Sequence, residues 1–199
     1  PNGLTPDTKG VVEVLKEYAT TTGDGRWRYK PEVNCRDSEH SEMIYYLSEL
    51  GKKAGFKVWV GNKEQGDAYR NEKLSKFCTE LNLELSGFTN DELRRIAMID
   101  VLWYENSSVK YIFEVENSTS ITSAIERASH IPEEYETKRF IVIPEERQKM
   151  LERKMNEPMF QEGYNKYKWQ TTHYDALKDF YNLHKSDKTL KRDDLTNLK

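Results

Sequence analysis

The chain of 199 residues lacks several features that would define a protein class at once. Its only two cysteines, Cys35 and Cys78, are far apart and have no metal-ligand spacing, so neither a disulfide framework nor a zinc site is expected. No apolar run is long enough to span a bilayer, and no segment has the pattern of a secretory signal. These absences predict free thiols, no membrane partner and a cytoplasmic location.

Charge is abundant but not of one sign. Charged residues make up 33% of the chain and the formal net charge is -3, so no global preference for nucleic acid is indicated. A local basic groove is compatible with such a total. The length suits one α/β domain with a substantial core. The start at Pro1 predicts either a processed N-terminus or a domain of a longer protein, with further domains elsewhere.

Two apolar segments, 99–104 and 111–117, are joined by a short polar turn and predict a pair of strands. Three carboxylates interrupt them: Asp100, Glu114 and Glu116. Because residues two apart on a strand share a face, Glu114 and Glu116 are expected to project together.

Buried carboxylates that lie close together are costly unless a cation or a shared proton compensates them. A hard divalent ion, Mg²⁺ or Mn²⁺, is the expected compensator because it takes oxygen ligands. The alternative is a half-exposed strand whose acids face solvent. Ile112 lies on the same face as Glu114 and Glu116, which argues against a fully wet face.

Periodicity and turn residues predict the remaining elements. Helices are expected over 8–18, 38–54, 72–80, 118–130, from 144 onward and over 174–184, and strands over 56–60, 139–143 and 164–172, with a polar loop over 61–71 and a charged, frayed tail over 185–199.

The helix over 38–54 is expected to begin with Asp37 or Ser38 as its N-cap and to end at Gly55. Its apolar stripe includes Met43, and Glu39 lies one turn earlier on the same side. Glu39 therefore is expected on the core-facing side at the start of the helix.

From residue 38 the elements run helix, strand, strand, strand, helix, strand, and here the chain resembles the PD-(D/E)XK nuclease superfamily. The resemblance covers about residues 38–143. Asp100 matches the acid early in the second core strand, Glu114 matches the acid of the third, and Glu39, with Glu42 as the alternative, matches the acid of the first helix. Glu116 stands where the family usually has Lys.

This resemblance implies an α/β fold of the restriction-endonuclease-like type (α-β-β-β-α-β), with a mixed central sheet flanked by helices. It implies a Mg²⁺- or Mn²⁺-dependent DNA endonuclease of restriction-modification or related defence type. Asp100, Glu114 and the backbone carbonyl of Val115 would hold the metal, and Glu39 would complete the catalytic set. Glu116 would accept a proton from water, orient that water, or bind a second ion.

Two other functions remain open from the sequence. One is a non-catalytic DNA-binding or assembly module on the same fold, in which the missing Lys reflects lost chemistry. The other is a structure-specific nuclease of repair or mobile-element type. Because duplex cleavage requires attack on both strands, the sequence also leaves open a homodimer.

Four basic residues are candidate DNA contacts: Arg26, Arg28, His40 and Arg127. Arg26 and Arg28 alternate with aromatic residues, a pattern that also suits a strand with solvated charges. His40 could contact phosphate or cap its helix. Arg127 could contact phosphate or pair with an acid on its own helix.

The predicted organisation has three parts. Residues 1–37 form an N-terminal extension that links to, or edges, another domain. Residues 38–184 form the nuclease-like domain, and residues 185–199 form the charged C-terminal tail.

Overall fold

The computed structural model describes residues 19–21, 26–29, 31–116 and 121–198. The chain divides into two compact units, Pro1–Glu39 and His40–Lys199. In the first unit, strands β1 (Ala19–Thr21) and β2 (Trp27–Tyr29) pair antiparallel. The predicted helix over 8–18 lies outside the described residues.

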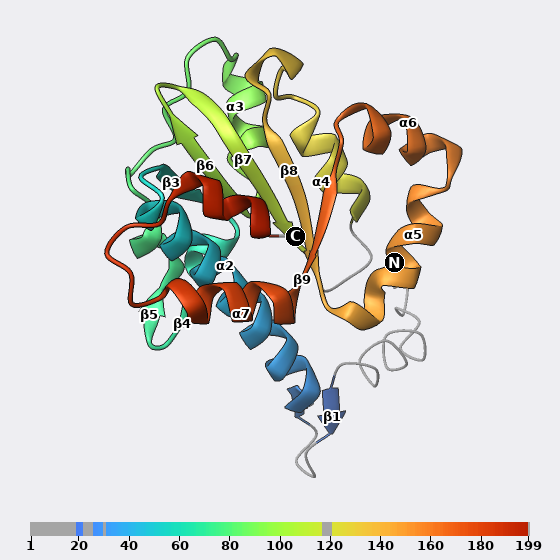
Figure 1. The fold of residues 1–199 in the computed structure, drawn as a ribbon. Helices are drawn as coiled ribbons and strands as arrows, with labels where there is room; N and C mark the ends of the chain where they lie inside the picture. The colour runs from blue at the N-terminus through green and yellow to red at the C-terminus, as the bar shows by residue number, and fades with distance from the viewer. Residues whose placement is uncertain (1–18, 22–25, 30, 117–120, 199) are drawn as a thin grey trace, which may run out of the picture. The chain divides into compact units, whose positions relative to one another are not determined.

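The second unit is built on a five-stranded mixed sheet (Figure 1). Its strands, in spatial order, are β3 (Lys57–Val60), β6 (Val101–Glu105), β7 (Ser108–Val115), β8 (Lys138–Ile143) and β9 (Gln170–His173). The pairs β3–β6 and β6–β7 are antiparallel, whereas the pairs β7–β8 and β8–β9 are parallel. Together with the helices on both faces, this confirms the predicted α/β fold with a mixed central sheet, compatible with a restriction-endonuclease-like core.

Helices and short turns surround this sheet. The α-helices are α2 (Pro31–Lys53), α3 (Asn90–Ile96), α4 (Ile121–Ala128), α5 (Gln148–Met155), α6 (Pro158–Lys166) and α7 (Tyr174–His184). The 3-10 turns are η1 (Glu64–Gly66), η2 (Leu74–Phe77), η3 (Glu133–Tyr135), η4 (Glu145–Arg147) and η5 (Arg192–Asn197), and β4 (Ala68–Tyr69) with β5 (Glu72–Lys73) forms a small hairpin.

The hairpin β6–β7 is closed by a two-residue turn. Asn106 and Ser107 both adopt positive φ, 48° and 61°. Left-handed conformations at both central positions match the right-handed twist of the flanking strands, and Asn tolerates them well. The predicted turn between the two apolar segments is therefore confirmed.

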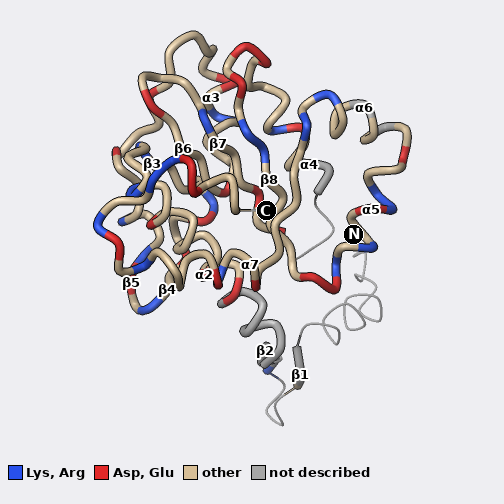
Figure 2. Tube along the Cα trace, in the orientation of Figure 1, with Lys and Arg blue, Asp and Glu red and all other residues tan. Residues whose placement is uncertain are grey.

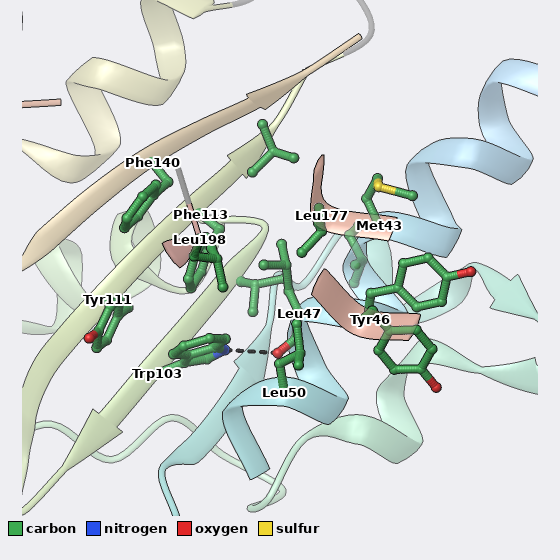
Figure 3. Packing of buried hydrophobic residues seen from close by; sticks show 14 of the residues in the cluster. Met43, Tyr46, Leu47, Leu50, Trp103, Tyr111, Phe113, Phe140, Leu177 and Leu198 are labelled. Atoms are coloured by element: carbon green, nitrogen blue, oxygen red, sulfur yellow. Dashed lines mark hydrogen bonds between the residues drawn. The ribbon is translucent and has the colours of Figure 1, made fainter. Parts of the chain in front are cut away.

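One face of the sheet carries a row of aromatic side chains, which Figure 3 shows packed against α2 and α7. Trp103 lies at the centre of this face and is fully buried. Its indole Nε1 donates to the carbonyl oxygen of Leu47 in α2, at 3.0 Å (Figure 3). Gly51 makes the close approach of this helix feasible, since a Cβ there would lie 2.4 Å from the Trp103 Nε1.

The opposite face packs against α4 and its neighbours. Leu102 and Ile112 from the hairpin share one buried cluster with Ala128 of α4, and Ala124 of the same helix is also fully buried. The small side chains of α4 let the helix approach the strands closely. Residues of the hairpin thus alternate between two apolar layers, as the strand period requires.

Two helix predictions are wrong in their extent. Helix α2 begins at Pro31 and not at Asp37 or Ser38, because proline suits the first helical position. Its end is confirmed: it stops at Lys53, and Gly55 adopts a φ of +80°. The predicted helix over 72–80 is wrong, since Leu74–Phe77 forms only a 3-10 turn.

The C-terminal segment also differs from its prediction. The strand expected over 164–172 is replaced by α6 and a shorter strand, Gln170–His173. The tail is not frayed, because Leu190, Leu195 and Leu198 are buried in the core. The Thr172 hydroxyl also donates to the carbonyl oxygen of Leu198.

Charges of both signs are spread over helices and connecting segments (Figure 2). Within the part of the chain that the structure describes, no helix combines the length and the apolar character needed to cross a bilayer.

Candidate active site

Three predicted acidic residues meet where β6 begins and β7 ends. Val101 pairs with Phe113, so Asp100 and Glu114 occupy the next positions along the two neighbouring strands. Asp100 is 6% exposed, Glu114 0% and Glu116 5%. Such burial excludes the interpretation that these acids face solvent from a half-exposed strand.

A hydrogen bond ties Asp100 to β7. The backbone N–H of Val115 donates to Asp100 Oδ2 at 2.8 Å. In a strand the N–H and C=O of one residue point to the same side, so the carbonyl of Val115 also faces the side on which Asp100 lies. On its other side β7 continues its pairing with β8, as Glu116 N–H donates to the Val142 carbonyl at 2.9 Å.

Arg127 on α4 reaches across to Glu114. Its Nε donates to Glu114 Oε1 at 3.1 Å and a terminal nitrogen donates to Oε2 at 2.5 Å. This two-bond arrangement is the strong geometry for a guanidinium and a carboxylate. Arg127 therefore pairs with an acid of the site and not with an acid on its own helix. The predicted pairing within the helix is wrong.

A fourth buried acid, Glu64, was not predicted from the sequence. It is the first residue of η1, just after β3, and is 4% exposed. Gly61 N–H donates to the carbonyl of Asp100 at 2.9 Å, which fixes the turn against the start of β6. The sequence signal was weak, because a single Glu in a polar loop is normally solvated.

Positive charge near this acid comes from two residues. Lys63 Nζ lies 4.0 Å from Glu64 Oε1, and His40 on α2 interacts electrostatically with Glu64. The structure therefore brings His40, a predicted DNA contact, into the electrostatic neighbourhood of the acids.

The remaining predicted site residues belong to the N-terminal unit. Glu39 is its last residue, Arg26 is exposed and Arg28 lies in β2. Their contributions to catalysis and to DNA binding stay predictions.

Burial dominates the electrostatics of the acids. It raises the pKa of Asp100 to about 7, and the Val115 N–H and Arg127 oppose that rise. The pKa of Glu114 is also raised, by burial first and by the nearby Asp100 second. Arg127 counteracts the rise at Glu114, and the paired geometry is that of an ionised carboxylate. Burial and then Asp100 raise the pKa of Glu64 in the same way.

The chemistry of the donor set suits a hard divalent cation. Four buried carboxylates and one carbonyl supply oxygen ligands of the kind that Mg²⁺ prefers. Glu64 Oε2 is buried without a hydrogen-bond partner among the residues that the structure describes. Within the described ranges, however, no three His, Cys, Asp or Glu side chains converge on one point as a ready-made metal site. Because Arg127 donates one hydrogen bond to each oxygen of Glu114, a cation would share that carboxylate with Arg127 or displace the guanidinium.

Comparison with known proteins identifies a family that matches most of the chain. The family model of the C-terminal domain of the type II restriction enzyme NmeDI matches residues 29–195. No curated protein sequence and no solved structure matches the chain. The matched range contains the whole five-stranded sheet and all four buried acids. The chain therefore belongs to the family of type II restriction enzyme NmeDI C-terminal domains.

Proposed function

We propose that this protein is a divalent-metal-dependent endonuclease that hydrolyses phosphodiester bonds of DNA in a restriction-modification system. Membership in a type II restriction enzyme family supports the reaction class and DNA as the partner. One observation of the fold carries the proposal: Asp100, Glu114 and Glu116 are buried together at the end of two central strands. Clustered acids in an apolar setting are typical of functional sites.

Asp100 and Glu114, with the carbonyl of Val115, would hold Mg²⁺ or Mn²⁺. The cation, when bound, supplies an activated water and neutralises charge on the scissile phosphate. Glu116 stands at the position where the resembled family usually has Lys. From there it can accept a proton from the attacking water. It cannot supply the positive charge of a Lys. Arg127, once separated from Glu114, can donate two hydrogen bonds to a phosphate.

A second candidate function is a non-catalytic DNA-binding or assembly module. The ion pair of Arg127 with Glu114 favours it, because the guanidinium neutralises one predicted metal ligand without any cation. The burial of Asp100 and Glu116 beside that pair favours the enzyme, since each further buried carboxylate adds a desolvation cost.

Incubation with plasmid DNA in Mg²⁺, Mn²⁺ or EDTA separates the two functions. We expect nicking or linearisation with either metal and none in EDTA. Asp100→Asn and Glu114→Gln should each lower the rate by about 100-fold or more, because metal ligands contribute several kcal/mol to the transition state. Asp91→Asn, an exposed acid on α3, is the matched control and should cut normally.

The variants Glu116→Ala and Glu116→Lys test the position at which this chain has Glu where the resemblance predicts Lys. Loss of nicking in Glu116→Ala supports a role in proton transfer or metal binding. Retained cleavage by both Asp100→Asn and Glu114→Gln would overturn the proposed active site. Binding of DNA without cleavage under any metal would favour the module. Preference for branched or gapped DNA over plasmid would favour a structure-specific nuclease.

A further inference from the structure

Glu64 is buried where a solvated loop residue was expected, and one of its two carboxylate oxygens has no hydrogen-bond partner among the described residues. Its side chain is 5% exposed, yet Oε2 accepts no hydrogen bond from the described residues. A buried carboxylate oxygen without a partner is costly and rare in folded proteins. Such an atom is normally retained for a ligand or for chemistry.

The turn around Glu64 is shaped to keep this carboxylate in place. A Cβ on Gly61 would lie 2.5 Å from Glu64 Oε2 and 2.8 Å from the carbonyl oxygen of Ile99. The carboxylate is therefore packed directly over the Cα of Gly61, beside the backbone that leads into Asp100. Only glycine leaves this space, so the close approach depends on the residue type at 61.

The position of the turn directs Glu64 to the same end of the sheet as the other acids. Val60 pairs with Val101, and Gly61 N–H bonds to the Asp100 carbonyl at 2.9 Å. Glu64 N–H in turn donates to the Gly61 carbonyl at 3.0 Å. Glu64 and Asp100 are close enough for their negative charges to repel each other. A divalent cation between them would turn that repulsion into attraction.

We infer that Glu64 is an additional carboxylate ligand of the divalent cation, which it reaches from the turn after β3. The inference rests on the proposed function, because it requires the cation at Asp100 and Glu114. It places the fourth acid on a turn at the end of the first core strand, whereas the resemblance predicted Glu39 on the helix.

Isothermal titration calorimetry with Mn²⁺ and no DNA tests this ligand directly, with the full chain. Glu64→Gln should bind Mn²⁺ at least about 10-fold more weakly than the wild type. Asp67→Asn, an exposed acid three residues further along the same loop, should bind within about twofold. Glu114→Gln, a ligand of the proposed function, should also bind more weakly.

Thermal unfolding in EDTA separates a ligand from a structural residue. Without metal, Glu64→Gln should be as stable as the wild type or more stable, because it removes a buried charge that repels Asp100. Adding Mn²⁺ should raise the melting temperature of the wild type more than that of Glu64→Gln. A melting temperature that falls in EDTA would show that the charged carboxylate stabilises the fold itself, which would overturn the inference.

The remaining outcomes distinguish the two proposals. Wild-type affinity in Glu64→Gln together with weak binding in Glu114→Gln would overturn the inference about Glu64 and support the proposed function. No Mn²⁺ binding by the wild type would overturn both.

Discussion

The two faces of the hairpin β6–β7 are made by alternating residues of the same strands, and both bury apolar side chains, but only one of them also carries a group of acids. On one face Trp103 and Phe113 pack against α2 and α7, and the one polar atom of Trp103 has its partner in Leu47. On the other face Asp100 and Glu114 are equally buried but repel each other and depend on Arg127.

The comparison shows how a fold can carry an unfavourable group of acids. The aromatic face stabilises the hairpin by burying large apolar side chains, which contributes about 2–3 kcal/mol for each. The acidic face costs stability, because desolvation penalises each carboxylate. Buried apolar residues on both faces hold the strands in register, so the few positions at the end of the second face can carry acids.

The largest expected effect concerns the buried ion pair. Arg127→Met should lower the free energy of unfolding by about 3–5 kcal/mol, because it leaves the Glu114 carboxylate buried and unpaired. Adding Glu114→Gln to this variant should recover much of the loss. Urea unfolding of the two single variants and the double variant measures the coupling.

The matched control is the other arginine–glutamate pair that involves α4. Arg95 Nη1 and Glu126 Oε1 lie 3.4 Å apart, but both side chains are exposed. Arg95→Met should therefore lower the free energy of unfolding by at most about 1 kcal/mol. Equal losses of unfolding free energy in Arg127→Met and Arg95→Met would contradict this prediction, because they would show that burial does not strengthen the ion pair of Arg127 with Glu114.

A second prediction uses pH to separate the faces. The pKa of Asp100 is raised to about 7 from an ordinary 3.8, so the folded protein binds a proton that the unfolded chain releases. The stability that this proton provides is complete below pH 3.8 and is lost as the pH rises through about 7. In EDTA, unfolding free energy should therefore fall between pH 5 and pH 8, by on the order of a few kcal/mol.

Asp100→Asn should flatten that slope, since Asn keeps the acceptor for the Val115 N–H but cannot titrate. The difference between wild type and variant cancels the contribution of every titratable group that the substitution leaves unchanged. A variant as pH-dependent as the wild type would contradict the raised pKa.

The smallest expected effect lies on the aromatic face. Trp103→Phe should cost about 1–3 kcal/mol, because it leaves the Leu47 carbonyl buried without its indole donor. This loss should be the same at pH 5 and pH 8 and with or without Mn²⁺. A loss that changed with metal or pH would mean that the two faces are coupled. Urea unfolding under the four conditions provides the measurement.

Sequence patterns predicted the parts of the molecule whose residues act locally. Alternation along β6 and β7 placed Glu114 with Ile112 on one face, and both are fully buried. The turn at Asn106 and Ser107 was also predictable, because Asn and Ser are common turn residues and Asn tolerates a left-handed conformation. The buried strand 139–143 followed from an unbroken apolar run.

The misses have a common cause in tertiary contacts. The tail over 185–199 is charged, and only its position against the core shows that Leu195 and Leu198 are buried. Glu64 was assigned to a polar loop because nothing local distinguishes it from a solvated glutamate. Its burial follows from the pairing of β3 with β6, which closes the turn onto Asp100.

The sequence by itself determined the fold class and the three acids on the central hairpin, because strand period and apolar content are local properties. Only the tertiary structure decided which charges meet those acids. Arg127 comes from the helix after β7 and Glu64 from the turn after β3, and each contact depends on packing between segments distant in the chain. Local patterns carry no information on such distances, so the charge balance of the site had to be found in the fold.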